Sequence, residues 1–432
     1  MTKSELVHRI EAYIPDSLLV AYRKTKRYCI WRCQQRAYCN AVRKIKKKDG
    51  PLKVVFIVND SSTWKYDSVY RLMAKDNRFE PEILICPLVV HYSETQATEI
   101  FNRTYAFFTS RGYNVIKASQ KVYEESIDVH ALHPDLVFYS SLWTAYMNPK
   151  YSEKSLRKYL KGYVNYGFSN TAGEWGYASA FHGLMWRYFA ECKDIQTIAL
   201  AAQPREMRNI VVTGYPIYDE YSDAAYDLSI WKNSSPKFKR IIWAPHHSIQ
   251  GHDGLLKLST FLEIAETMLE LAESRKGKCQ FAFKPHPLLL QALYDHPQWG
   301  KKRADAYYKK WAGGENTCLV TGGYMSLFKT SDAMIHDCGS FIVEYLYTQK
   351  PVLYMGGNRE EQSNIIGRKA YQCHYHGNTI SDIENFLNLV VLKGIDNMKT
   401  VREHFYKEIL LPPNGCSVAE NIVSEIKREL RQ

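Results

Sequence analysis

The segment Ser331–Met355 constrains the fold more than any other part of the chain. Its short apolar run, Ala333–Ile335, predicts a buried strand, and the small residues of Asp337–Ser340 predict a tight turn. Apolar positions then recur at helical spacing from Phe341, and Val352–Met355 predicts the next buried strand. A strand, a helix and a parallel strand in this order form a βαβ unit, which indicates an α/β sheet.

The turn of this unit is a candidate anion site. The first N–H groups of a helix at the carboxyl edge of a parallel sheet are free to bind a phosphate. Gly339 lets a ligand approach the backbone, and the Ser340 hydroxyl can donate to a phosphate oxygen. Glu344 lies one turn further on, where it can hold a sugar hydroxyl. The alternative is an N-capped helix without a ligand.

Strands alternate with helices over the rest of the chain as well. Further strands are expected at Lys53–Val58, Ile83–Cys86, Asn114–Ile116, Leu136–Tyr139, Gly162–Tyr166, Asn209–Gly214, Arg240–Ala244, Gln280–Lys284 and Thr317–Val320. Helices are expected at Thr95–Ser110, Tyr177–Glu191, Thr260–Ala272, Asp382–Val391 and Val418–Glu429. This pattern predicts two doubly wound, Rossmann-like domains facing a cleft, with functional loops at the strand ends Asn59–Asp67, Ser140–Thr144 and Tyr166–Gly176.

Composition shifts divide the chain into three parts. Residues 1–50 are a basic helical arm, residues 51–227 the first domain and residues 228–432 the second, with a polar linker at Leu228–Lys239. The arm holds 13 Lys or Arg against 4 Asp or Glu, so it carries +9 of the net +12 and leaves about +3 elsewhere. A nucleic-acid-binding protein would carry positive charge on its folded domains as well, so we expect no nucleic-acid partner.

Apolar and aromatic residues interleave with the basic ones from Ser4 to Lys48. A helix of this kind lies in a membrane interface and is held by anionic lipid; the alternative is a solvated basic face. We expect residues 1–48 to bind an anionic membrane surface. The chain has no apolar run of 18 residues and no secretory signal, and its ten cysteines show no disulfide or zinc pattern. The expected location is the cytoplasm, on the inner face of the cell membrane.

Histidines follow two of the predicted strands in the second domain. Pro285 and Pro287 fix the backbone around His286 and leave its ring projecting outward, so His286 is the first candidate for binding a charged oxygen or moving a proton. His246 and His247 follow the neighbouring strand. The three histidines together could bind a metal, but no acidic partner occurs at ligand spacing, and we expect neither metal nor cofactor. His182, on an expected apolar helix, is either a core residue or a catalyst.

Several enzyme signatures are absent: the P-loop, the GxGxxG turn, the GxSxG elbow and a metal-binding Asp-x-Asp pair. Two α/β domains with a phosphate-sized anion site remain, which indicates a group transferase with a nucleotide-activated donor.

Four ordered motifs resemble the CDP-glycerol glycerophosphotransferase family, the polymerases and primases of teichoic-acid type polymers. They are VTGYP (212–216), the strand ending in Ala244 and Pro245, KPHP (284–287), and SDAMIHDCGSFIVEYLYTQKPVLY from Ser331. The resemblance covers roughly residues 200–360. It implies the two-domain GT-B fold, a last helix that crosses back to the first domain, and peripheral attachment to a membrane.

The resemblance also implies roles for the candidate residues. His286 contacts or protonates the donor diphosphate, Gly339 and Ser340 bind its phosphates, and Asp337 shapes their turn. Lys284, His246 and Glu344 complete the donor-binding set that we expect.

Two motifs depart from the family. Its Trp-His-Gly, whose histidine is the expected base, is replaced by residues 165–167 (Asn-Tyr-Gly), and its Pro-Thr-Trp-Arg by residues 245–248 (Pro-His-His-Ser). Either His182 or His247 takes over as base, or the acceptor and linkage differ.

The expected function is transfer of glycerol phosphate, or a related polyol phosphate, from a CDP-activated donor to a hydroxyl of a cell-surface glycan or teichoic-acid-like polymer, with release of CMP. The acceptor is a glycan or a lipid-linked glycan. One alternative is a GT-B glycosyltransferase that uses a nucleotide sugar in capsule or lipopolysaccharide synthesis. Another is a non-catalytic scaffold of an envelope-polymer complex.

Overall fold

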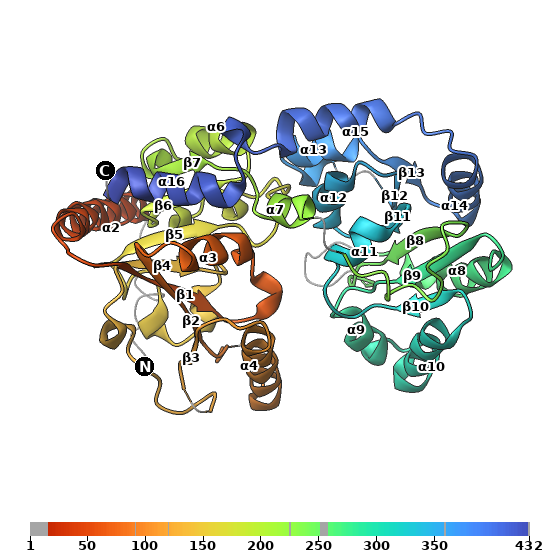
Figure 1. Ribbon diagram of the computed structural model, residues 1–432, viewed down its shortest axis with the longest axis horizontal. Coiled ribbons are helices and arrows are strands. Elements are labelled where there is room, and N and C mark those ends of the chain that lie inside the picture. The colour runs from red at the N-terminus through yellow and green to blue at the C-terminus, as the bar shows by residue number, and fades with distance from the viewer. Residues whose placement is uncertain are drawn as a thin grey trace.

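The computed structural model describes residues 16–90, 92–119, 121–223, 226–250, 258–357 and 360–430. These residues form two α/β lobes, each built on one parallel sheet (Figure 1). The first sheet has seven strands in the order β3-β2-β1-β4-β5-β6-β7, and the second has six in the order β10-β9-β8-β11-β12-β13. Every pair of neighbours in both sheets is parallel. The expected GT-B architecture of two doubly wound domains is therefore confirmed.

The strands of the first sheet are β1 (Leu52–Val58), β2 (Phe79–Ile85), β3 (Val115–Lys117), β4 (Leu136–Tyr139), β5 (Leu160–Val164), β6 (Arg187–Ala190) and β7 (Ile210–Val212). Those of the second are β8 (Lys239–Ala244), β9 (Cys279–Phe283), β10 (Thr317–Leu319), β11 (Ala333–His336), β12 (Val352–Met355) and β13 (Tyr375–Gly377). Residues 228–238, the predicted linker, run between the two sheets without a strand or an α-helix.

The helices of the first half are α2 (Asp16–Ile45), α3 (Asp67–Ala74), α4 (Glu94–Thr109), α5 (Ala180–Gly183), α6 (Lys193–Ala202) and α7 (Ile217–Ser222). Those of the second half are α8 (Phe261–Ser274), α9 (Leu289–Asp295), α10 (Gly300–Gly313), α11 (Met325–Thr330), α12 (Phe341–Glu344), α13 (Ile365–Tyr371), α14 (Ile380–Asn385), α15 (Lys399–Phe405) and α16 (Val418–Leu430). A π-helix, 386–392, continues α14.

The prediction of a helix over Tyr177–Glu191 is wrong. Only the four residues of α5 are helical there, and the segment continues as β6, which pairs with β5 on one side and β7 on the other. Tyr188, Phe189 and Ala190 are fully buried in this central position. Aromatic residues favour a strand that is buried on both faces, and this tertiary context overrides the helical spacing of the sequence.

The two faces of the second sheet pack into different cores. Side chains alternate along a strand, so Ile241 and Trp243 of β8 face the helices α8 and α10, whereas Ile242 and Ala244 face the opposite side. That opposite side belongs to one continuous hydrophobic cluster with the first domain. The two lobes are therefore joined by buried apolar contact and not by the linker alone.

The last helix, α16, lies against α3 of the first lobe (Figure 1). Gly214 makes this approach possible because its φ is +92° and because a Cβ there would lie 2.8 Å from the Pro412 side chain. The carboxylate of Asp219 then accepts the backbone N–H groups of Val418 and Ala419 at 2.8 and 2.9 Å, which caps the helix.

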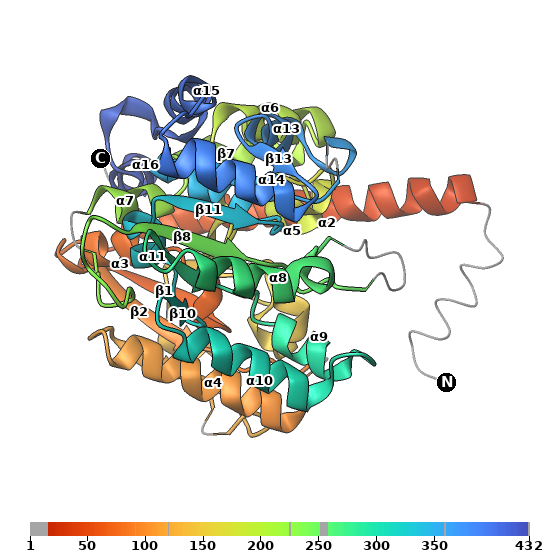
Figure 2. The ribbon, with the colours of Figure 1, turned by 90° about the vertical axis from the view of Figure 1, so that its right-hand side faces the viewer.

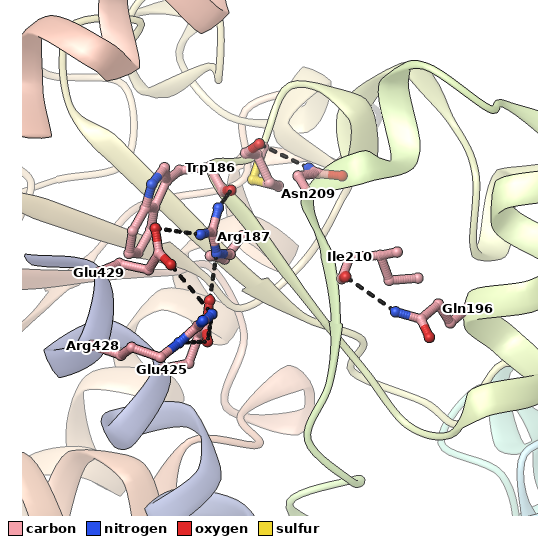
Figure 3. A network of polar contacts seen from close by, with 9 residues as sticks. Trp186, Arg187, Gln196, Asn209, Ile210, Glu425, Arg428 and Glu429 are labelled. Carbon is pink, nitrogen blue, oxygen red and sulfur yellow. Dashed lines mark hydrogen bonds and ion pairs between the residues drawn. The ribbon is translucent and has the colours of Figure 1, made fainter.

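Ion pairs hold the far end of α16 on the first sheet (Figure 3). Arg187 of β6 contacts Glu425 at 2.8 Å and Glu429 at 2.7 Å. A further pair, outside this view, joins Lys427 to Asp76, which follows α3, at 2.8 Å. The glycine, the cap and these pairs together place the end of the chain on the first lobe. We propose that residues 51–227 form the first domain and residues 228–432 the second. Helix α16 belongs to the second domain in sequence but packs on the first.

Within the described residues, the N-terminal arm is exposed in its first part and packed on the first lobe in its second. Residues 16–45 form α2, which projects from the first lobe at its N-terminal end (Figure 2); the earlier part of the predicted arm lies outside the described residues. Around Tyr22 the helix is exposed, whereas Tyr38 is buried and donates from its hydroxyl to the Leu184 carbonyl at 2.5 Å. No helix of the described residues combines the length and the apolar character that crossing a bilayer requires.

Candidate functional site

Three histidines meet at the carboxyl edge of the second sheet. His246 and His247 follow β8, and His286 follows β9, the neighbouring strand. Their ring centroids lie 4.2 Å (His246 to His247), 5.0 Å (His246 to His286) and 4.1 Å (His247 to His286) apart. All three side chains are half-buried. The topology therefore brings together the histidines that the sequence placed at separate strand ends.

Local turns orient two of these rings. The backbone N–H of Leu288 donates to Nδ1 of His286 at 3.2 Å, and that of Ser248 donates to Nδ1 of His246 at 3.3 Å. A ring nitrogen that accepts a hydrogen bond carries no proton, so each neutral ring has its proton on Nε2. His286 and His246 consequently offer N–H donors, which suit an anionic oxygen.

Lys284 adds a positive charge beside the histidines. It directly follows β9 and is buried, and the burial lowers the pKa of its ammonium group. Burial, followed by the neighbouring His247 and Lys284, lowers the pKa of His286 to about 3, so this ring is neutral at pH 7. Burial also lowers the pKa of His247. A buried cation beside neutral N–H donors makes an electropositive site that a phosphate would stabilise.

Asp337 follows β11, on the other side of β8, and shapes the floor of the site. One carboxylate oxygen accepts the backbone N–H of His246 at 2.5 Å, and the other accepts the backbone N–H of Thr260 at 2.7 Å. Burial raises the Asp337 pKa to about 6, although these hydrogen bonds act in the opposite direction. The residue thus connects the histidine loop to the start of α8.

The predicted phosphate turn borders the first domain. Ser340 is exposed at the start of α12, which is only four residues long and continues as a 3-10 turn. The side-chain amide of Asn170 donates to the Gly339 carbonyl at 2.7 Å. Gly367 allows this approach, because a Cβ there would lie 2.2 Å from the Asn170 carbonyl oxygen. A loop of the first domain therefore closes one side of the turn.

Glu344 is not placed to hold a sugar hydroxyl as expected. It is buried, and its carboxylate accepts the hydroxyl of Tyr215 at 2.9 Å and that of Tyr324 at 2.5 Å. The Lys65 ammonium donates to the Tyr324 hydroxyl at 2.9 Å. Because Lys65 and Tyr215 come from the first domain, Glu344 holds the two domains together.

His182 does not join the three-histidine cluster. It is fully buried in the first domain, where Nδ1 contacts the Ser179 hydroxyl at 2.8 Å and Nε2 contacts the Asn165 amide oxygen at 3.3 Å. Burial lowers its pKa to about 3. These contacts are those of a neutral core residue, and they leave no exposed ring atom for a substrate.

The three clustered rings also meet a geometric condition for a metal site, since one nitrogen of each lies within 4.8 Å of the others. Two observations favour an anion over a metal ion at the three histidines. The Nδ1 contacts of His246 and His286 leave their Nε2 atoms protonated, and a nearby cation would repel the Lys284 ammonium. The expectation of no metal stays a prediction.

The sequence alone does not single out three residues that join the domains near this site, although each lies in a motif or loop that it identifies. Tyr215 lies in the VTGYP motif, Lys65 in the loop predicted after the first strand, and Asn170 in the loop predicted after the fifth. Position at a strand end identified these loops, but it did not indicate which side chain would reach the second domain.

Residues 183–368 match the sequence model of the CDP-Glycerol:Poly(glycerophosphate) glycerophosphotransferase family. The match covers somewhat less than half of the chain. The matched residues include all three clustered histidines, Lys284 and the turn 337–340. The resemblance expected from the four motifs is confirmed, and the chain is a glycerophosphotransferase-like enzyme. A comparison with curated protein sequences gives no match.

Solved structures resemble the chain over most of its length. A variant of the wall teichoic acid polymerase TagF is 14% identical, with a TM-score of 0.56 over 92% of this chain and 99% of that one. The MnaA protein of S. aureus with UDP is 14% identical, with a TM-score of 0.54 over 88% and 97%. The UDP-GlcNAc 2-epimerase of Neisseria meningitidis is 14% identical, with a TM-score of 0.53 over 87% and 100%. At these identities the likeness shows a common fold.

Proposed function

We propose that this glycerophosphotransferase-like enzyme moves glycerol phosphate, or a related polyol phosphate, from a CDP-activated donor to a hydroxyl of a cell-surface glycan or teichoic-acid-like polymer. The observation that carries the proposal is the family match over residues 183–368, which contains the cluster of His246, His247, His286 and Lys284 at one sheet edge. This cluster has the charge and the donors that a diphosphate requires.

In the proposed reaction an oxygen of the acceptor hydroxyl attacks the phosphorus that carries the polyol. The bond between this phosphorus and the oxygen bridging to CMP breaks, and CMP leaves with the bridging oxygen. The N–H groups of His246 and His286, together with the Lys284 ammonium, stabilise the charge that grows on the leaving phosphate. In this proposal the transferred phosphate is held by the exposed Ser340 hydroxyl and by the turn at Gly339, whose carbonyl accepts the Asn170 amide.

The acceptor proton needs a base. His247 is the candidate that we retain, because its ring lies 4.1 Å from His286 between centroids and its Nδ1 is buried without a hydrogen-bond partner in the described residues. Burial lowers its pKa, which keeps the ring neutral and able to accept a proton at pH 7. We assign His182 a positioning role through Asn165.

The donor is tested directly. The purified protein is incubated with an acceptor preparation from envelope polymer and, in separate reactions, with CDP-glycerol, CDP-ribitol and UDP-linked sugars. Release of CMP from a CDP-polyol with transfer of label to the acceptor supports the proposal. Release of UDP with no CMP would contradict it.

A nucleotide-sugar glycosyltransferase of capsule or lipopolysaccharide synthesis is the second candidate. The observation that favours it is Tyr166, which occupies the position of the family's expected base histidine, and whose hydroxyl accepts the Trp143 indole N–H at 3.2 Å. The same donor panel separates the two activities, because the nucleotide product differs.

We further propose that α2 attaches the enzyme to an anionic membrane surface at the inner face. Leu18, Tyr22 and Ile30 are exposed on the projecting part of the helix, among Arg23, Lys24 and Lys26. Exposed apolar and aromatic side chains beside basic ones suit the boundary between headgroups and acyl chains.

Removal of residues 1–48 would also remove Tyr38 from the core, so charge reversal is the cleaner test. The variant Arg23→Glu/Lys24→Glu/Lys26→Glu should lose sedimentation with vesicles that contain phosphatidylglycerol. The matched control is Lys301→Glu/Lys302→Glu on α10 of the second domain. Equal sedimentation of the arm variant and the wild type would reject the proposal.

A further inference from the structure

Four aromatic side chains gather at the carboxyl edge of the first sheet. Trp143 and Tyr146 lie in the loop after β4, and Tyr166 and Trp175 lie in the loop after β5. The ring of Trp143 stacks at 5.9 Å on Tyr146, with an interplanar angle of 10°, and lies 5.9 Å from the ring of Trp175. Its indole N–H bonds the Tyr166 hydroxyl. We call these four residues the aromatic platform.

The platform is exposed and yet held in place. Trp143 is 36% exposed and Trp175 is 50% exposed. The backbone N–H of Trp143 donates to the Ser141 hydroxyl at 3.1 Å. Gly173 lets Trp175 fold over its own loop, since a Cβ at position 173 would lie 2.4 Å from the Trp175 indole nitrogen. Large aromatic rings kept ordered and in water are unfavourable for the free protein and mark a binding surface.

The platform adjoins the donor side of the molecule through one loop. Asn170, in the same loop as Tyr166 and Trp175, donates to the Gly339 carbonyl at 2.7 Å. Trp175 follows Asn170 by five residues, so the two Cα atoms are at most about 18 Å apart even if the chain is extended. A ligand on the platform is therefore near the turn where the donor phosphate is proposed to bind.

We propose that the aromatic platform binds a pyranose ring of the acceptor, which makes the acceptor a glycan and not a bare polyol-phosphate chain. This inference rests on the proposed transferase function. The C–H groups on one face of a pyranose form a flat apolar surface that stacks on an indole, while the ring hydroxyls at its edge need polar partners. The Tyr166 hydroxyl and the exposed Glu174 carboxylate supply them.

The charge near the platform also favours a neutral sugar over a polyol phosphate. The Glu174 carboxylate lies next to Trp175 in sequence and accepts the Gln203 amide at 3.3 Å. A linear polyol phosphate has no flat ring to stack, and its phosphates would be repelled by this carboxylate. A neutral sugar meets neither difficulty.

The test uses the full chain and three probes: chitotriose, maltotriose and a linear glycerol phosphate trimer. Saturation-transfer NMR detects binding, and isothermal titration measures the affinity of each probe that binds. At least one trisaccharide should bind. Trp175→Ala should weaken that binding at least tenfold, and Trp175→Phe should restore most of it. Tyr226→Ala is the matched control, because Tyr226 is 59% exposed but lies outside the platform.

Three results would overturn the inference: neither trisaccharide binds, Trp175→Ala binds as well as the wild type, or the glycerol phosphate trimer binds more tightly than both trisaccharides and depends on Trp175. Binding of CDP-glycerol, measured in the same samples, separates this inference from the proposed function. Loss of trisaccharide binding with unchanged CDP-glycerol binding supports a platform in an intact enzyme. A wild type that binds the trisaccharide but not CDP-glycerol refutes the proposed function alone.

Discussion

The hydroxyl of Tyr215 donates to the carboxylate of Glu344 at 2.9 Å, and this contact joins the two domains inside a buried environment. Tyr215→Phe removes the donor and leaves a buried carboxylate oxygen without this partner. We expect the free energy of unfolding to fall by about 1–3 kcal/mol. Chemical denaturation measures the change, and Tyr226→Phe, at an exposed position, is the control that should lose nothing. Equal stability of both variants would show that the contact is dispensable.

His286→Ala should abolish turnover and leave the fold intact. The imidazole is half-exposed at a strand end, so its loss makes no core cavity, whereas a positioned donor to the leaving phosphate contributes roughly 10²–10⁴-fold in rate. Initial rates of CMP release measure the effect, and circular dichroism checks the fold. His376→Ala, at an exposed position on β13, is the matched control. Full activity of His286→Ala would remove this residue from the site.

Asp337→Asn should perturb the donor site more than the rest of the fold. The backbone N–H groups of His246 and Thr260 bond different carboxylate oxygens, and the amide replaces one of these oxygens by an NH2 donor, so one N–H group loses its acceptor. The histidine loop then loses an anchor, and we expect the donor KM to rise at least tenfold with a smaller change in kcat. Steady-state kinetics with varied donor test this, and an unchanged KM would contradict the anchoring role.

Stability should decrease in acid because of two buried histidines. Burial lowers the pKa values of His182 and His374 to about 3 each, against an ordinary value of 6.5. Below pH 6.5 the unfolded chain binds protons at these residues and the folded chain does not. Each histidine therefore lowers the free energy of unfolding by up to about 1.4 kcal/mol per pH unit as the pH falls from 6.5 towards 3. Urea unfolding at pH 7.5 and pH 5 measures this.

The matched variants are His182→Gln and His374→Gln, which keep a polar side chain but do not titrate. Each should show a smaller loss of stability between the two pH values than the wild type. If both variants lose as much as the wild type, other groups control the acid sensitivity.

Donor turnover should not require a metal at the three histidines. Treatment with EDTA should leave the rate of CMP release unchanged, because the rings of His246 and His286 present N–H donors to the shared space. Titration with zinc chloride provides the direct measurement. Stoichiometric zinc binding that disappears in His247→Ala, with loss of activity in EDTA, would replace the anion site by a metal centre.

Much of the architecture could be predicted because buried parallel strands are short, apolar and followed by polar turns. β1, β4 and β11 were located almost to the residue by this rule. The rule failed at β6, where Tyr188 and Phe189 have a spacing that fits a helix equally well, and only the neighbours β5 and β7 decide between the two.

The candidate site could be predicted in part. Strand ends in one sheet meet at the same edge, so the convergence of His246, His247 and His286 follows from topology. The burial of Glu344 between the domains could not be predicted. Its partner Tyr215 comes from the other domain, and no local sequence pattern encodes that contact. The same holds for His182, whose burial depends on packing against β6.

The capping of α16 by Asp219 has a consequence for synthesis. The ribosome makes the first lobe early, but the helix that covers α3 is made only after the whole second domain. Until then Arg187 lacks both of its carboxylate partners, and the apolar face awaiting α16 is bare to solvent. The nascent protein should therefore depend on chaperones until α16 has been made, and a premature stop before residue 418 should yield an aggregating fragment, not a working half.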